Sequence, residues 1–201
     1  MRCFIAIELD PNVRTSLTRL QRDLTLADVP VRWVRPEQMH ITLKFFGDVP
    51  AEAVTPIGQA MAEVAREVDP FDVAVVGAGC FPPSGRAVRV VWAGLYDPTG
   101  ELHRCQSRLE TALEGHGFAR DARPFSAHLT LGRTRSPHQA GPLRDRLEAE
   151  ASRKFGEQAV DSMILFESVL RKSGPAYTVL VRETLGSRGR PGVPGQKPPD
   201  P

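Results

Sequence analysis

The sequence predicts an α+β fold made of two lobes that are related by a pseudo-twofold axis. The order strand, helix, strand, helix, strand occupies residues 2–79, and the same order recurs over residues 87–170. The middle strand of each half carries a His-x-Thr motif, and the two histidines, His40 and His128, are 88 residues apart. The prediction depends on element order and on these motifs, because sequence identity between the halves is low. Such an axis would bring the two motifs together across a shared cleft.

The elements of the first half follow from apolar spacing and from end signals. Residues 2–9 are an apolar run typical of a buried strand. Asp10 caps the following helix, with Pro11 at its first position and apolar residues at helical spacing behind it. Residues 38–46 alternate apolar and polar side chains, as a half-buried strand does. The remaining elements are an extended piece at 31–33, a helix at about 51–68 and a strand at 71–79.

The second half repeats this order. Asp97 and Pro98 open a helix whose apolar stripe runs to Leu113, and residues 124–134 are again extended. The other predicted elements are strands at 87–95, about 159–170 and 176–183, and a helix at about 138–152. Residues 1–185 are therefore expected to form a single bilobal domain.

The end of the chain, residues 186–201, is rich in glycine and proline and is predicted to be disordered. Its three cations and one anion account for the net charge of +2, so the rest of the chain is neutral. A neutral body excludes strong non-specific attraction to nucleic acid, and any affinity for phosphate must be local.

Cysteine usage and hydropathy indicate a cytoplasmic protein. Cys3, Cys80 and Cys105 form no C-x-x-C pair, which is typical of reduced thiols in a cytosol. The apolar run within the first ten residues is too short for a signal peptide, and the acidic residues that follow it also argue against one. No run reaches the ~18 apolar residues of a membrane span. A monomer is expected, because no extra apolar surface stripe is evident.

Each motif places a histidine and a threonine on one strand face and apolar residues on the other. His40 and Thr42 form the first pair, and His128 and Thr130 form the second. A neutral imidazole can take a proton from water while a protonated one gives a proton to a leaving oxygen, which is the chemistry of phosphodiester cleavage. Threonine hydroxyls can donate hydrogen bonds to phosphoryl oxygens. This chemistry requires no metal or cofactor, and the histidine spacing fits no compact metal site.

Two basic residues follow the motifs. Strict alternation would place Arg133 on the face opposite His128, but Gly132 can bend or bulge the strand at that point. Arg133 is therefore a candidate for contacting phosphate or ribose, with a surface ion pair as the alternative. Lys44 shares the predicted face of His40 and is a weaker candidate, with a solvated lysine at the strand edge as the alternative.

Four stretches, RCFIAIEL, RWVRPEQMHITLKFFGDV, PFSAHLTLGR and SVLRKSGPAYTVL, resemble the RNA 2′,3′-cyclic phosphodiesterases of bacteria and archaea, also called 2′-5′ RNA ligases, within the 2H phosphoesterase superfamily. The resemblance covers about residues 2–185. It implies lobes of antiparallel sheet with outer helices around a central cleft. It also implies metal-independent hydrolysis of RNA 2′,3′-cyclic phosphate ends to 2′-phosphomonoesters, and reversible ATP-independent 2′-5′ ligation. His40 would be the proton donor to the 3′ oxygen, His128 the proton acceptor from water, and Thr42 and Thr130 the phosphate-binding residues.

Three points stay open at this level. Exchanging the acid and base roles would give a 3′-phosphate. The substrate could be a small cyclic nucleotide or a 2′-5′ oligoadenylate in place of an RNA end. A non-catalytic module that binds RNA ends is a third possibility, against which the two intact motifs argue.

Overall fold

The computed structural model describes residues 1–85, 87–134, 141–171 and 174–186. The tail that is predicted to be disordered therefore lies outside the described residues, apart from Gly186, and so does the predicted start of the fourth helix. Within the described ranges, no helix is both long enough and apolar enough to cross a membrane.

Helices and strands are both abundant, which confirms the predicted α+β class. The strands are β1 (Arg2–Glu8), β2 (Val31–Trp33), β3 (His40–Asp48), β4 (Phe71–Phe81), β5 (Val90–Tyr96), β6 (His128–Thr134), β7 (Lys154–Val160), β8 (Ser162–Arg171) and β9 (Gly174–Thr184). The helices are α1 (Pro11–Thr25), α2 (Val54–Glu67), α3 (Glu101–Gly115) and α4 (Gly141–Ala149), with short 3-10 turns η1 (Pro36–Gln38) and η2 (Ala51–Ala53).

Strand boundaries differ from the predicted ones at several points, and two of these differences bear on the arrangement of the sheets and the motifs. The strand predicted at 159–170 is two strands, β7 and β8, which only Asp161 separates. Here the chain changes sheets, since β7 pairs with β4 whereas β8 pairs with β1, and no local turn signal marks the change. Strand β6 begins at His128 and not at residue 124, so each motif opens its strand, as His40 opens β3.

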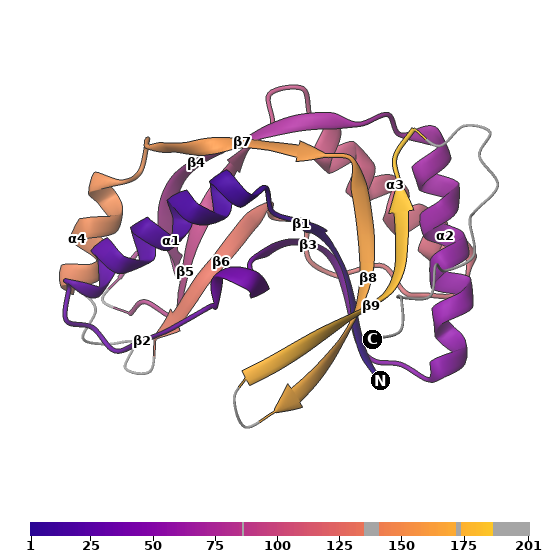
Figure 1. Ribbon diagram of the computed structural model, residues 1–201, viewed down its shortest axis with the longest axis horizontal. Coiled ribbons are helices and arrows are strands. Elements are labelled where there is room, and N and C mark those ends of the chain that lie inside the picture. Colours follow the sequence, from indigo (N-terminus) through magenta and orange to yellow (C-terminus); the bar gives the residue numbers. More distant parts are fainter. Residues whose placement is uncertain (86, 135–140, 172–173, 187–201) are drawn as a thin grey trace, which may run out of the picture.

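The strands form two antiparallel sheets (Figure 1). Sheet A has the order β3-β1-β8-β9, and sheet B has the order β2-β6-β5-β4-β7. Helices α2 and α3 lie together beside sheet A, whereas α1 and α4 pack against sheet B. The predicted arrangement of antiparallel sheets with outer helices is therefore confirmed.

The two halves of the chain exchange elements between the sheets. In sheet A the run β3-β1-β8 matches the run β6-β5-β4 in sheet B, so equivalent strands occupy equivalent places. The last strand of each run comes from the other half of the chain, β8 into sheet A and β4 into sheet B. Helix α1 likewise packs on sheet B, and α3 packs on sheet A. The pseudo-twofold order is present, but the lobes do not coincide with the sequence halves.

Apolar side chains are buried on both sides of sheet A. The main core contains the predicted stripe of α1, and Asp10 caps that helix by accepting a hydrogen bond from the Asn12 amide at 2.7 Å. The three cysteines are free and buried. A second, small cluster lies apart from the main core and beside His40; it consists of Phe4, Ala6, Ile164 and Phe166, with Tyr177 packed against them.

Candidate active site

The two motifs have matching geometry on β3 and β6. Leu43 and Leu131, which end the motifs, are buried together with the intervening Ile41 and Leu129. The histidines and threonines occupy the opposite strand faces, where they are partly or fully accessible. Burial of the alternate apolar residues thus fixes the direction in which the histidine and threonine of each motif point.

A β-bulge interrupts each strand immediately after the threonine. In β3 the pairing steps from Thr42 opposite Ala6 to Lys44 opposite Ile5, which leaves Leu43 as the extra residue. In β6 it steps from Thr130 opposite Trp92 to Gly132 opposite Val91, which leaves Leu131 as the extra residue. A bulge resets the alternation of side chains, so residues that follow it change faces.

The bulge in β6 decides the position of Arg133. Because Leu131 and Gly132 are both buried, the exposed side chain of Arg133 lies on the same face as Thr130 and lines the same cavity. The strand is therefore bulged as predicted, but the extra residue is Leu131 and not Gly132. Without the bulge, strict alternation would have placed Arg133 on the face opposite Thr130.

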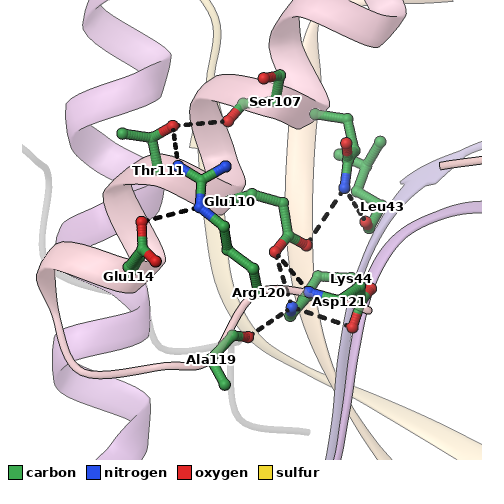
Figure 2. Close-up of polar contacts among 10 residues, drawn as sticks. Leu43, Lys44, Ser107, Glu110, Thr111, Glu114, Ala119, Arg120 and Asp121 are labelled. Carbon is green, nitrogen blue, oxygen red and sulfur yellow. Dashed lines mark hydrogen bonds and ion pairs between the residues drawn. The ribbon is translucent and has the colours of Figure 1, made fainter. Parts of the chain in front are cut away.

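The bulge in β3 places Lys44 on the buried face of its strand, away from His40 and Thr42. Lys44 is only 4% exposed and lies under α3, where its Nζ donates to Glu110 Oε2 at 2.9 Å, to the Ala119 carbonyl at 2.9 Å and to Asp121 Oδ1 at 3.1 Å (Figure 2). Both predictions for Lys44 are wrong, because it neither shares the face of His40 nor is solvated. It ties the segment after α3 to the strand that carries the first motif.

Two buried glutamines hold the bulges. Gln21 Nε2 donates to the Leu131 carbonyl at 2.9 Å and to the Val34 carbonyl at 2.8 Å. Gln106 Nε2 donates to the Leu43 carbonyl at 3.4 Å, while also bonding Glu110 at 3.2 Å. Gln21 lies on α1 and Gln106 on α3, so each half of the chain supports the bulge of the other half.

Both imidazoles are anchored in the same way. His40 Nδ1 lies 2.7 Å from the Gln38 carbonyl oxygen, and His128 Nδ1 lies 2.8 Å from the Ser126 carbonyl oxygen. A carbonyl oxygen can only accept a hydrogen bond, so each Nδ1 carries the hydrogen. In each ring, Nε2 is therefore the nitrogen that gains or loses a proton.

The two rings have different surroundings. His40 lies against the small aromatic cluster, with its ring centroid 4.8 Å from that of Phe4 and 5.6 Å from that of Tyr177. Burial lowers the pKa of His40 below its ordinary value of 6.5, and the hydrogen bond to Gln38 partly opposes this. His128 meets the ring of Phe81 edge-on at 5.5 Å.

A cavity of about 410 Å³ brings residues of both sheets together. His40 and Thr42 line it from sheet A, and Thr130 and Arg133 line it from sheet B. His128 is not among the lining residues, although it lies on the same face of β6, two positions before Thr130. Among the described residues, the lining includes three arginines and no acidic side chain, so the cavity is suited to an anion.

Several lining residues are absent from the sequence-based prediction. Arg32, Trp33 and Arg35 come from β2 and the loop that follows it, and Tyr177 comes from β9. They lie in stretches that carry the family resemblance, but nothing local in the sequence indicates that they face a cavity. Among the described residues, no cluster of three or more His, Cys, Asp or Glu side chains could hold a metal ion.

Comparison with protein families and curated proteins gives consistent matches. The family model described as LigT like phosphoesterase matches residues 7–92 and 96–177. An RNA 2′,3′-cyclic phosphodiesterase of Methanothermobacter thermautotrophicus is 35% identical over 178 residues, covering 89% of this chain and 95% of the relative. A protein of the same name from Archaeoglobus fulgidus is 35% identical over 177 residues, covering 88% of this chain and 96% of the relative.

Solved structures share the fold. The crystal structure of TT0787 of Thermus thermophilus matches with a TM-score of 0.77 and 28% identity, covering 92% of this chain and 98% of that chain. The crystal structure of E. coli LigT complexed with 3′-AMP matches with a TM-score of 0.74 and 26% identity, covering 92% and 97%.

Proposed function

Because the chain belongs to the LigT-like phosphoesterase family of the 2H superfamily, we propose that it hydrolyses RNA 2′,3′-cyclic phosphate ends to 2′-phosphomonoesters. The relatives described above are named for this substrate. The observation that carries the proposal is the pair of matching motifs on two facing sheets, with His40, Thr42 and Thr130 lining one basic cavity. Cytoplasmic location is also proposed, and the three buried free cysteines support it. A monomeric state is a further prediction.

The proposed mechanism uses one histidine on each side of the phosphate. His128 Nε2 takes a proton from water as the water oxygen attacks phosphorus. The bond from phosphorus to the 3′ oxygen breaks, and His40 Nε2 gives its proton to that oxygen. Thr42, Thr130 and Arg133 donate hydrogen bonds to the non-bridging oxygens, where negative charge increases in the transition state. With an RNA 5′-hydroxyl in place of water, the same ring-opening step would form a 2′-5′ bond and release the 3′-hydroxyl.

The environment of His40 bears on which histidine is the acid. Burial in the aromatic cluster favours the neutral ring, whereas a general acid must start protonated. A bound phosphate anion would favour the protonated ring and offset part of this effect. We keep His40 as the acid because of its position in the family motif. The reverse assignment predicts a 3′-phosphate product.

A small cyclic nucleotide is the second candidate substrate. A cavity of about 410 Å³ is within the range of small-ligand pockets, and the E. coli relative was solved with 3′-AMP. The chemistry would be unchanged, and only the number of nucleotides bound would differ.

The first test uses a short RNA that ends in a 2′,3′-cyclic phosphate, with EDTA present throughout. We expect the wild type to produce a 2′-phosphate, and His40→Ala and His128→Ala each to lower turnover by about 10²–10⁴-fold, the usual contribution of a general acid or base. A 3′-phosphate would reverse the two roles. A requirement for added metal, or full activity in either variant, would contradict the mechanism.

A further inference from the structure

Two arginines lie side by side at the edge of the cavity. Arg32 on β2 is the direct cross-strand partner of Arg133 on β6, and both line the cavity. Directly opposed residues in an antiparallel pair share a face, with Cβ atoms about 4.5–5.5 Å apart. Neither guanidinium forms a hydrogen bond or an ion pair with the described part of the chain, and both side chains are exposed.

Gly132 determines this arrangement. A Cβ atom at Gly132 would lie 2.6 Å from Val31 Cγ1 and 2.8 Å from Trp33 Cε3, so these side chains close over the glycine. They contribute to the main core on that face of the sheet. Arg32, which lies between them in β2, projects to the opposite face, as Arg133 does after Gly132. The absence of a side chain at position 132 therefore allows β2 to dock and to present Arg32 to the cavity.

The pair is unfavourable unless an anion is bound. Like charges directly opposite each other destabilise an antiparallel pair. Among the described residues, no acidic side chain lines the cavity to offset these two charges. Such an arrangement is typical of a site for phosphate, which guanidinium groups bind through charge-assisted hydrogen bonds.

The position of Arg32 separates it from the site of reaction. Thr130 and Arg133 are successive side chains on the same face of β6, because the bulge residue and Gly132 are both buried. Arg32 is the next side chain outward from Arg133, across to β2. A nucleotide with a single cyclic phosphate places one anion near Thr130, whereas an RNA strand carries a further phosphate for each additional nucleotide.

We propose that Arg32 binds the phosphodiester that precedes the cyclic phosphate, beside the site formed by Thr130 and Arg133. This proposal rests on the proposed function and refines its substrate to a strand of at least two nucleotides. Arg32 is then a residue that determines specificity, since it binds a group that the reaction leaves unchanged.

The test compares three substrates, of which the two dinucleotides differ only in one charge. They are uridine 2′,3′-cyclic phosphate, the dinucleotide UpU ending in a 2′,3′-cyclic phosphate, and the same dinucleotide with an uncharged methylphosphonate internal linkage. We expect the wild type to favour the charged dinucleotide in kcat/KM. Arg32→Gln should lower the ratio of charged to uncharged dinucleotide by about tenfold, since one charge-assisted contact is lost. Arg32→Lys should restore part of it.

Arg146→Gln is the matched control, because Arg146 is an exposed arginine on α4 and does not line the cavity. It should leave the ratio unchanged. Equal kcat/KM for the charged and uncharged dinucleotides in the wild type, or a ratio that Arg32→Gln does not alter, would overturn the subsite while leaving the proposed function intact.

A binding measurement separates the subsite from catalysis. Dissociation constants of both dinucleotides are measured with His128→Ala, and with His128→Ala combined with Arg32→Gln. The charged dinucleotide should bind more tightly only when Arg32 is present. If the wild type hydrolyses none of the substrates, the proposed function fails, and this comparison alone decides whether the anion site exists.

Discussion

His40 and His128 share the same anchoring but differ in burial. In each ring, Nδ1 donates to the carbonyl of the residue two positions earlier, so the reactive nitrogen is the same in both. His40 alone lies against Phe4 and Tyr177, and its pKa is lowered by that burial. Because burial disfavours the charged ring, uncovering the ring should raise its pKa toward 6.5.

Tyr177→Ala should therefore identify the role of His40. We expect the midpoint of the His40 titration, followed by NMR of the ring Cε1 proton, to rise. If His40 is the acid, kcat/KM falls as pH rises through this pKa, so the alkaline limb of the profile moves to higher pH. If His40 is the base, the acidic limb moves to higher pH.

Tyr96→Ala is the control for this experiment, because Tyr96 is 60% exposed on β5 and does not contact His40. It should leave the His40 midpoint in place. An unchanged midpoint in Tyr177→Ala would show that Tyr177 does not control the burial of the ring.

At the scale of the elements, the paired bulges explain why two similar motifs are followed by different residues. In β3 the bulge turns Lys44 under α3, where it bonds Glu110 and Asp121. In β6 the corresponding bulge leaves Gly132 buried and directs Arg133 toward the cavity. Each bulge carbonyl accepts a hydrogen bond from a helix of the other half, so helix position and strand geometry are coupled.

Gln21→Met tests this coupling. The Leu131 carbonyl would keep its hydrogen bond from the Val34 amide but lose the one from the glutamine. We expect the free energy of unfolding to fall by about 1–2 kcal/mol, the usual range for one or two buried hydrogen bonds. We also expect kcat/KM to fall by several-fold, because Arg133 is held less firmly. Urea denaturation and steady-state kinetics give the two values.

A double-mutant cycle separates positioning from general loss of stability. If Gln21 acts through the bulge, Gln21→Met should have a smaller effect on kcat/KM in an Arg133→Gln background than in the wild type. Gln59→Met, at an exposed position on α2, is the matched control and should change neither quantity. Additive effects of Gln21→Met and Arg133→Gln would contradict the coupling.

At the scale of the molecule, the exchange of β4 and β8 makes each sheet depend on both halves of the chain. Neither half can complete a sheet or cover it with its own first helix, since α1 packs on sheet B and α3 on sheet A. The prediction of a single domain over residues 1–185 therefore implies that the two sheets unfold together.

We expect one cooperative transition in urea. Both tryptophans, Trp33 and Trp92, lie in sheet B, so their fluorescence reports on that sheet. Hydrogen exchange of the amides of β1 reports on sheet A. The two midpoints should coincide, and they should match the midpoint from far-ultraviolet circular dichroism. Well-separated midpoints would mean that the sheets unfold as independent units.

The sequence by itself determined which residues are the candidates for the chemistry and the kind of element on which each lies. Alternation over a few residues places His40 with Thr42 and His128 with Thr130, because the apolar neighbours must be buried whatever the partner strand is. Helix caps and apolar stripes are similarly local, and the predicted stripe of α1 is buried. The family resemblance also depends on these short stretches.

The tertiary structure alone decided how the strands pair and what the cavity contains. The faces of Lys44 and Arg133 depend on bulges whose register is set by β1 and β5, and the exchange of β4 and β8 joins segments from different halves of the chain. Arg32 reaches the cavity only because β2 pairs with β6, about a hundred residues further along the chain. The spacing of apolar residues along a short stretch indicates which side chains are buried. Strand register and pairing, in contrast, arise from contacts between residues that are distant in the sequence.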